Sequence, residues 1–266
     1  MERLKGISRR ISSEVHRYEF SVCTFVTRKV EYEEMLDSFL NKGFGLDRCE
    51  YLYIDNCDVC SFDAYEGINK FLREANGKYI IICHQDVVLT DDNYQDLSRR
   101  LEQLGEKDGK WGICGNAGAA GPNHVVYHLT YPNEGLKSKG KFPLKVSSLD
   151  ENFLILKSSA YLSVSTDLRG FHLYGTELCL QAELHGYSAY VIEFNLTHKS
   201  KGNPRMDFYE IRKALIKKYN YFFRNRWIQT NITTFHLSGS FFGQLIGNFI
   251  FLYFVRIYNG IMKRIK

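Results

Sequence analysis

Short apolar runs alternate with amphipathic segments along the first half of the chain. The apolar runs have the length of strands and lie at residues 20–27, 49–56, 78–83 and 111–115. Such near-continuous runs are typical of strands buried on both faces of a parallel sheet. Between them, apolar residues recur at helical spacing. In the segment that starts at Asp63, Ile68 and Phe71 share one face, and Asn76-Gly77 is a stop signal. The pattern predicts an α/β fold with a mostly parallel central sheet and helices on both faces.

The second half of the chain is less regular. Residues 151–162 indicate a strand followed by a turn. Residues 174–194 indicate a helix, capped by Thr176 and ended by Gly186, with a strand after it. The stretch "GNAGAAG" (115–121) follows the fourth predicted strand, so it does not match the dinucleotide-binding pattern, and we expect a tight loop that allows close backbone approach.

Three groups of residues with polar side chains fall at the carboxyl ends of predicted strands. They are Thr24 to Thr27, Asp55-Asn56 and His84-Gln85-Asp86. In open sheets of this kind ligands bind beyond these ends, so the groups predict the rim of a crevice. Asp86 would offer a hard oxygen ligand that leaves positions open for phosphate oxygens and water, as a divalent cation requires. The alternative is that Asp86 only caps the following turn.

Composition limits the class of protein. The chain has 266 residues, of which 44% are hydrophobic, enough to bury the core of one large domain with or without an appendage. Residues 1–20 are basic without an apolar central region, which predicts no secretory leader. Seven cysteines, an odd number, suit a reducing compartment better than a disulfide framework. We therefore expect a cytoplasmic protein.

The basic charge is concentrated in the C-terminal segment. Residues 205–266 contain eleven Lys and Arg against two Asp and Glu, whereas the rest of the chain has 24 against 28. Residues 241–258 are mostly aromatic and aliphatic but include Gln244, Asn248 and Arg256, which favours a helix in the interface of an anionic membrane over a membrane span. The protein would then be peripheral at the inner face of the cytoplasmic membrane. The alternative is a helical pair that packs on the rest of the chain or on a second copy in a homodimer. Nucleic acid is not an expected partner, because the body is acidic and carries no nucleic-acid module.

Three segments in order carry a resemblance to a known family. They are "YIDN" (53–56), "INKFLREANGKYIIICHQDVVL" (68–89) and "FHLYGTELCLQAELHGYSAYVIE" (171–193). Together they resemble the bacterial glycosyltransferases with the GT-A, nucleotide-diphospho-sugar transferase fold, in the family-2-like branch typified by the streptomycin-biosynthesis glycosyltransferase domain. In that branch His-Gln-Asp-Val stands in the position of the Asp-x-Asp metal motif. The resemblance covers roughly residues 18–205.

The resemblance implies a role for several positions around the nucleotide. Asp86 matches the metal-binding carboxylate, and His84 takes the place of the first Asp of the motif. Asp55 matches a carboxylate that contacts the base. The full set of implied nucleotide-pocket residues is Thr24, Val26, Thr27, Asp55, Asn69, His84 and Gln85. For Asn69 a polar surface position is the equal alternative.

The resemblance also implies residues for chemistry. Glu177 matches the general base that would take the proton of the acceptor hydroxyl. The alternative is structural, because acidic residues are favoured in the first turn of a helix. Asp150, beside Glu151, matches an acidic residue of the acceptor site, where a turn is the alternative. His198 would complete the metal coordination, although a lone His is more often structural. Independently of the resemblance, the charges of the nearby Lys199, Lys201 and Arg205 could neutralise the leaving diphosphate.

The resulting prediction is an inverting, metal-dependent glycosyltransferase. It would use Mn²⁺ or Mg²⁺ and move a sugar from a nucleotide-diphosphate donor, a UDP-sugar first, to a hydroxyl of a cell-surface or lipid-linked saccharide. The catalytic domain would span residues 1–206, with a nucleotide-sugar half at 18–120 and an acceptor half at 121–206, and residues 207–266 would form a helical extension. The alternatives are a nucleotidyltransferase that makes sugar nucleotides, although the glycines of its usual first loop are missing here, and a non-catalytic binding protein of the same fold.

Overall fold

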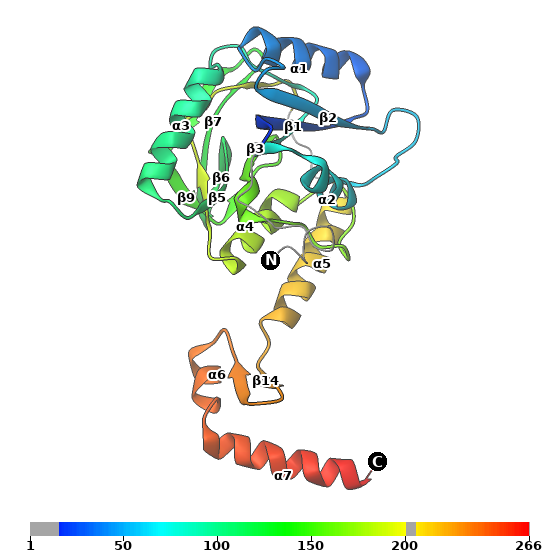
Figure 1. The fold of residues 1–266 in the computed structure, drawn as a ribbon, viewed down its shortest axis with the longest axis vertical. Coiled ribbons are helices and arrows are strands. Elements are labelled where there is room, and N and C mark those ends of the chain that lie inside the picture. The colour runs from blue at the N-terminus through cyan, green and yellow to red at the C-terminus, as the bar shows by residue number, and fades with distance from the viewer. Residues whose placement is uncertain (1–15, 201–205, 266) are drawn as a thin grey trace, which may run out of the picture. The chain divides into compact units, whose positions relative to one another are not determined.

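The structure is a computed structural model that describes residues 16–200 and 206–265. Its central sheet has the strand order β2-β1-β3-β11-β5-β12-β9 (Figure 1). Strand β1 pairs in parallel with β2 and with β3. The strands of this sheet are β1 (Tyr18–Val26), β2 (Cys49–Asp55), β3 (Gly77–His84), β5 (Trp111–Gly115), β9 (Leu144–Val146), β11 (Phe153–Lys157) and β12 (Ser188–Val191). The four strands predicted in the first half are therefore confirmed.

Helices cover both faces of this sheet. Side chains of α1 and α3 share one buried cluster with β1 and β3, whereas α2 and α4 lie on the other face, where Phe71 of α2 meets Phe25 of β1 with ring centroids 5.2 Å apart (Figure 1). The helices of the body are α1 (Lys29–Asn41), α2 (Ala64–Glu74), α3 (Tyr94–Lys107) and α4 (Tyr174–Leu184), with a 3-10 turn at Ser158–Ala160. The predicted layering is confirmed.

Aromatic rings fill the core between β1, α1 and α3. The ring of Phe20 lies 5.7 Å from that of Phe44 and 5.8 Å from that of Tyr94, with the second pair edge-to-face. Such pairs stabilise the fold beyond the area they bury, by about 0.5–1.5 kcal/mol each. Helix α3 begins in a capping box, in which Asn93 accepts from the N–H of Asp96 while the Asp96 carboxylate accepts from the N–H of Asn93.

Strand β11 departs from the simple alternation that the sequence predicts. It lies between β3 and β5 and is antiparallel to both, so the fourth predicted strand is not the neighbour of the third. Five of the seven strands still run in one direction. Because β11 runs backwards, its first residues and the loop before it lie at the carboxyl ends of the parallel strands, so this loop joins the functional edge of the sheet.

A second sheet covers that edge. Its order is β10-β6-β7-β13-β4, with β8 paired to β7. Residues 117–121, expected as part of a tight loop, form β6, so that expectation is wrong; the close approach is real, because a side chain at Gly118 would collide with the carbonyl oxygen of Ser148. The strands of this sheet are β4 (Val87–Val88), β6 (Ala117–Gly121), β7 (His124–Tyr131), β8 (Gly135–Lys139), β10 (Ser148–Leu149) and β13 (Thr197–His198).

Helix α4 begins earlier than its sequence suggests. Its N-cap is Leu173, in the left-handed conformation with φ 64°, and Thr176 lies inside the first turn. The prediction that Thr176 caps this helix is therefore wrong. The first turn is instead bound from outside, because backbone N–H groups of Leu173 and Gly175 donate to the carboxylate of Glu151.

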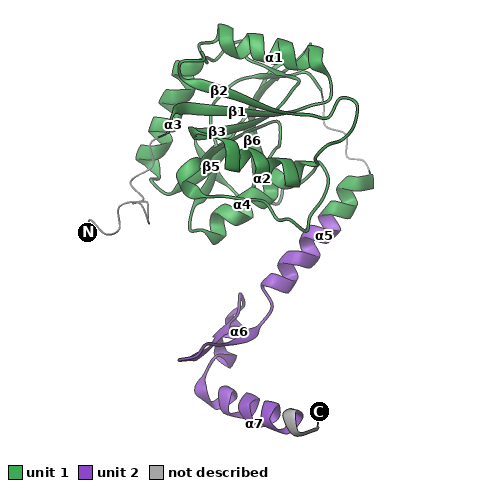
Figure 2. Ribbon diagram, turned by 45° about the vertical axis from the view of Figure 1, so that its right-hand side comes forward, with its two compact units in different colours: residues 1–211 green, residues 212–266 purple. Residues whose placement is uncertain are grey.

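The chain divides into two compact units, residues 1–211 and residues 212–266 (Figure 2). The second unit, called unit 2, contains the end of α5 (Met206–Phe222), a hairpin of β14 (Arg226–Gln229) and β15 (Thr234–Leu237), and the helices α6 (Phe241–Ile246) and α7 (Phe249–Ile265). The predicted helical extension therefore also contains a β-hairpin. Within the described ranges, no helix combines the length and the apolar character needed to cross a bilayer.

We expect Gly77→Ala to lower the free energy of unfolding by about 1–3 kcal/mol, because an added Cβ would overpack the sheet. A Cβ at Gly77 would lie 2.5 Å from the backbone nitrogen of Ser21, on the neighbouring strand. Gly109→Ala is the matched control, since nothing lies within 4 Å of the added atom. Urea titration of both variants measures the difference, and equal midpoints would contradict this account of β1–β3 packing.

Candidate functional site

Three predicted residues meet at the carboxyl end of β3. The Nε2 of His198 lies 3.4 Å from Oδ1 of Asp86 and 3.4 Å from Nδ1 of His84, and the Nδ1 of His84 lies 4.0 Å from the same Asp86 oxygen. Among the described residues these three form the group of side chains that could hold a metal ion. The structure therefore brings together side chains separated by more than a hundred positions in the chain.

The second sheet makes this meeting possible. After His84 the chain turns away from the central sheet and enters β4, which pairs with β13 so that His198 lies opposite Val87. The backbone N–H of Lys199 also donates to the carbonyl oxygen of Asp86, at 3.0 Å. Backbone pairing thus fixes His198 beside Asp86 before any ligand binds.

Burial and charge set the protonation states of the group. Asp86 is 8% exposed. Burial alone would raise its pKa, but hydrogen bonds from His198 and Ser200 and the charges of the two histidines outweigh burial and hold the pKa well below the usual range. Burial and the charge of His198 lower the pKa of His84, against the opposing charges of Asp86 and Asp150. An ionised carboxylate beside a neutral imidazole is the state in which these groups ligate metals.

Tyr174 fixes the orientation of His84. The Tyr174 hydroxyl lies 3.3 Å from Nε2 of His84 and donates to the carbonyl oxygen of Glu151, also at 3.3 Å. A hydroxyl has one hydrogen, so when it donates to the carbonyl it accepts from His84, and Nε2 carries the imidazole proton. The lone pair is then on Nδ1, which faces Asp86 and His198. Partners of this kind set the tautomer of metal-ligating histidines.

The geometry of the three ligand atoms fits a single divalent cation. The triangle with sides of 3.4, 3.4 and 4.0 Å has a circumscribed radius of about 2.1 Å, close to ordinary metal–nitrogen and metal–oxygen distances. An ion at that distance from all three atoms would lie in their plane, so positions above and below the plane would remain for further ligands. The donor set is two imidazoles and one carboxylate.

A cavity of about 730 Å³ lies next to this group. Its wall includes Asn152, whose carbonyl oxygen accepts from the N–H of His84, and Tyr131, whose ring centroid is 6.3 Å from that of His198. Asp150 and Glu151 line the same cavity. A second hollow, of about 390 Å³, lies at the opposite ends of the strands near Asn76 and contains none of the three ligands.

Glu151 differs from its neighbour Asp150 because it is partly buried. Burial, reinforced by the charge of Asp150, raises its pKa from an ordinary 4.5 to about 8, although the backbone N–H groups of Gly175 and Leu173 favour the charged form. Asp150 is exposed and accepts at 3.0 Å from the N–H of Asn152 through Oδ1. The two neighbours therefore present one neutral and one accessible carboxyl to the cavity.

The rim of the crevice on the other side is formed by the ends of β1 and β2. Gln85 accepts from the N–H groups of Thr27 and Arg28 at 2.8 and 2.9 Å, and its amide donates to the hydroxyl of Thr27. Asp55 is exposed at the end of β2; a hydrogen bond from the N–H of Cys57, with help from Lys29, lowers its pKa. Thr27, Asp55 and Gln85 thus lie at the predicted edge, and Gln85 ties β1 to β3.

Other predicted residues lie elsewhere. Thr24 is fully buried within β1, with its hydroxyl 3.6 Å from Sγ of Cys83, and Val26 is part of the hydrophobic core. Their side chains do not line the crevice, contrary to prediction. The ammonium group of Lys199 pairs with Glu34. Lys201 and Arg205 lie outside the described residues.

Asn69 and Glu177 share a structural task that their sequence context does not reveal. The amide of Asn69 donates to the carbonyl oxygen of Val164 at 2.8 Å and accepts from its N–H at 3.1 Å. Glu177 is fully buried, and its carboxylate accepts from the N–H of Ser165 at 3.1 Å and from the Ser165 hydroxyl. Both side chains bind the loop that follows β11, and neither reaches the crevice, so their predicted nucleotide and general-base roles are not supported by this geometry.

The sequence did not single out Tyr174 and Asn152. Both lie beside residues that it did, Tyr174 in "LYGTE" and Asn152 after the Asp150-Glu151 pair. The Oδ1 of Asn152 is buried and has no hydrogen-bond partner among the described residues. Their position next to carboxylates in the sequence was the available signal, but only the fold shows that both residues contact His84.

Comparison with known proteins identifies the family. No family model matches the chain. The protein named "ATP synthase subunits region ORF 6" from Fuscovulum blasticum is 37% identical over 213 residues, which cover 78% of this chain and 86% of that protein. This chain belongs to the same family. The name of that relative states no reaction.

Two solved structures resemble this chain in fold. The mannosyltransferase PcManGT from Pyrobaculum calidifontis, in complex with GDP-Man and Mn²⁺, matches with a TM-score of 0.51 and 13% identity over 83% of this chain and 69% of that chain. S. aureus TarS 1-349 in complex with UDP-GlcNAc matches with a TM-score of 0.50 and 12% identity over 75% of this chain and 66% of that one. Identities this low show the fold alone. This chain therefore has the mixed α/β fold of GT-A glycosyltransferases, as predicted.

The pKa of Glu151 generates a prediction for stability. A raised folded-state pKa contributes stability that is fully present below the unfolded value of 4.5 and is lost as the pH rises through about 8. Glu151→Gln removes this dependence while keeping a carbonyl acceptor. We expect the unfolding temperature of the variant, minus that of the parent, to increase between pH 4.5 and about 8. Glu33→Gln on α1 controls for loss of a charge, and a difference that is constant with pH would contradict the assignment.

Proposed function

We propose that this protein is a glycosyltransferase that moves a sugar from a nucleoside-diphosphate donor, a UDP-sugar first, to an acceptor hydroxyl. The observation that carries the proposal is the His84–Asp86–His198 group at the carboxyl edge of a GT-A sheet, next to a cavity of about 730 Å³. In open α/β sheets this edge is where ligands bind. The nucleotide would occupy the side formed by the ends of β1 and β2, and the acceptor would occupy the cavity.

The donor set favours one of the two predicted metals. Mg²⁺ prefers oxygen ligands in octahedral geometry, whereas first-row transition ions also accept imidazole nitrogen. Two imidazoles and one carboxylate therefore favour Mn²⁺ over Mg²⁺. Bound there, the cation would offset the charge that develops on the diphosphate leaving group. Tyr174 would act as a positioning residue, because it holds His84 with Nδ1 toward the ion.

We assign the general base to Asp150. Asp150 is exposed and lines the cavity, and its charge raises the pKa of His84, as expected for a carboxylate close to this histidine. In a single displacement, Asp150 takes the proton of the acceptor hydroxyl while the acceptor oxygen bonds to the anomeric carbon. The bond from that carbon to the diphosphate oxygen breaks, and the oxygen leaves with the electron pair. Attack opposite the leaving group inverts the anomeric configuration.

The cavity wall suits a saccharide acceptor. Tyr127 and Tyr131 provide aromatic surface, and Ser148 and Asp150 add polar groups to the wall. Apolar walls with a few placed polar groups are the usual construction of small-molecule sites. We propose a cell-surface or lipid-linked saccharide as the acceptor, with residues 1–206 as the catalytic domain acting at the inner face of the cytoplasmic membrane.

The β1–α1 connection argues against the nucleotidyltransferase alternative. Between Val26 and Lys29 the connection consists of Thr27 and Arg28, which leaves no room for a glycine-rich phosphate loop. A non-catalytic binding protein would show donor binding without turnover, so the experiments below separate it from an enzyme.

Metal binding is the first test. We expect the parent protein to bind Mn²⁺, measured by loss of the EPR signal of the free ion, with excess Mg²⁺ competing weakly. Asp86→Asn and His84→Ala should each weaken Mn²⁺ binding by about tenfold or more, since ligand loss should cost at least as much as loss of an outer-shell partner. Asp37→Asn on the exposed side of α1 is the matched control. Equal Mn²⁺ affinity in Asp86→Asn and Asp37→Asn would refute the metal centre.

Donor binding follows from the same site. A panel of UDP-sugars and GDP-sugars should include one donor that raises the unfolding temperature with Mn²⁺ present and fails to do so in Asp86→Asn. If one donor protects equally with and without Mn²⁺, the metal-bridged binding mode is wrong.

Turnover separates the two candidate bases. We expect Asp150→Asn to reduce kcat by about 10²–10⁴ while donor protection is kept. Glu177→Gln should instead lower the unfolding temperature, because it weakens the tie to Ser165, and should retain turnover in the folded fraction. The reverse pattern would return the role of base to Glu177.

A further inference from the structure

Helix α7 in unit 2 exposes an apolar face. On its outer side Phe254 is 62% and Tyr258 is 63% exposed. At 100° per residue, eight exposed apolar residues lie on the same half of the helix. We call this set the α7 face: Ile250, Phe251, Tyr253, Phe254, Ile257, Tyr258, Ile261 and Met262.

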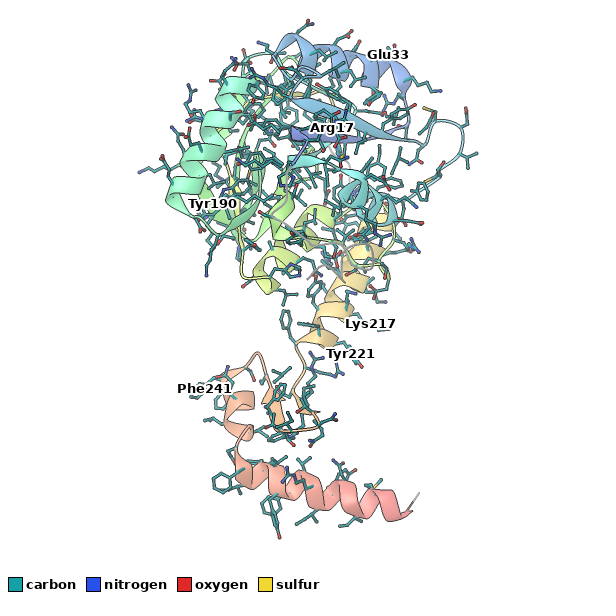
Figure 3. All side chains as sticks on the ribbon, viewed as in Figure 1. Arg17, Glu33, Tyr190, Lys217, Tyr221 and Phe241 are labelled. Atoms are coloured by element: carbon teal, nitrogen blue, oxygen red, sulfur yellow. The ribbon has the colours of Figure 1, made fainter. Side chains whose placement is uncertain are left out.

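The opposite side of α7 is mixed in polarity. It carries Arg256 and Asn259 together with Phe249, Leu252 and Val255, of which Leu252 and Val255 are half-buried. The guanidinium of Arg256 donates to the hydroxyl of Thr234 in β15, at 3.4 Å. This contact places the side that carries Arg256 toward the hairpin, so the α7 face points away from it. Helix α6 adds Phe241 and Phe242, which are 69% and 78% exposed, and Phe241 projects outward from its helix (Figure 3). Apolar surface of this extent is typical of an interaction site.

The charge of unit 2 decides between the possible occupants. Residues 212–266 contain ten Lys and Arg and no Asp or Glu. A second copy that docks through the same face would bring two such charges together without a carboxylate on either side to compensate them. An anionic lipid surface is complementary, and each Lys or Arg near such a surface strengthens binding about fivefold.

The length and side-chain distribution of α7 fit a helix lying in the plane of the interface. Its 17 residues extend for about 25 Å, and the hydrocarbon core of a bilayer is about 30 Å thick. Arg256 and Asn259 interrupt the apolar composition on one side only. An amphipathic helix with a broad aromatic face and basic flanks binds at the headgroup boundary.

We propose that the α7 face, with Phe241 and Phe242 of α6, binds the interface of an anionic membrane. Membrane binding extends the proposed function, and it depends on that function only for the nature of the acceptor. A catalytic unit held at a bilayer would meet an acceptor whose saccharide is linked to lipid, whereas a soluble saccharide would gain nothing from this arrangement.

The test uses flotation of the full chain with vesicles. We expect binding to phosphatidylcholine vesicles that contain phosphatidylglycerol, little binding without it, and loss of most binding at about 1 M salt, where the Debye length is about 3 Å. Phe254→Ser with Ile257→Ser should reduce the partition coefficient by about tenfold or more, since both side chains lose burial in lipid. Leu46→Ser with Val59→Ser, at positions in the body that are 70% and 73% exposed, is the matched control and should bind as the parent does.

A second readout places the helix at the bilayer. Phe254→Trp should be quenched by brominated lipid, and Asn259→Trp on the opposite side should be quenched less. Equal flotation of the two serine pairs, or equal quenching at the two positions, would overturn the proposal. Dimers in sedimentation that Phe254→Ser with Ile257→Ser dissociates, without vesicle binding, would assign the face to a second copy. If donor and Mn²⁺ still raise the unfolding temperature of the Phe254→Ser, Ile257→Ser variant, failure of the membrane proposal is distinguished from failure of the proposed function.

Discussion

A buried carboxylate beside two imidazoles is the constraint on which the functional edge of the body depends. Asp86 is 8% exposed, and an ionised group at that depth is stable only when hydrogen bonds and opposite charge compensate its desolvation. His198 and Ser200 provide those hydrogen bonds. His198 reaches Asp86 because β13 pairs with β4, so the second sheet and the group of Asp86, His84 and His198 stabilise each other.

The same region shows that carboxyl groups can differ in environment rather than in type. Glu177 accepts from Ser165 in the interior and holds the loop after β11, together with Asn69. Glu151 binds the first turn of α4, where burial makes its neutral form favourable. Asp150 is exposed to the cavity. Three acidic side chains within one region therefore have three different tasks, and burial and partners assign them.

The two units carry opposite charge. Residues 1–211 have 25 Lys and Arg against 30 Asp and Glu, whereas residues 212–266 have ten against none. The body buries its aromatic residues in the core between β1 and α3, while α6 and α7 expose theirs. The basic unit is therefore also the one that carries the exposed aromatic surface, a combination typical of an interaction site.

The sequence by itself determined the first three βα units, because near-continuous apolar runs and helical periodicity are local signals, and it placed Asp55 and Asp86 at strand ends for the same reason. It did not determine that β11 would run backwards between β3 and β5, or that residues 117–121 would form a strand. Tertiary structure also decided the partners. Residue types alone could not separate His198, which meets Asp86 and His84, from Glu177 and Asn69, which bind the loop after β11. The position of His198 depends on the pairing of β13 with β4 across more than a hundred residues, and such pairing leaves no periodic trace in the chain.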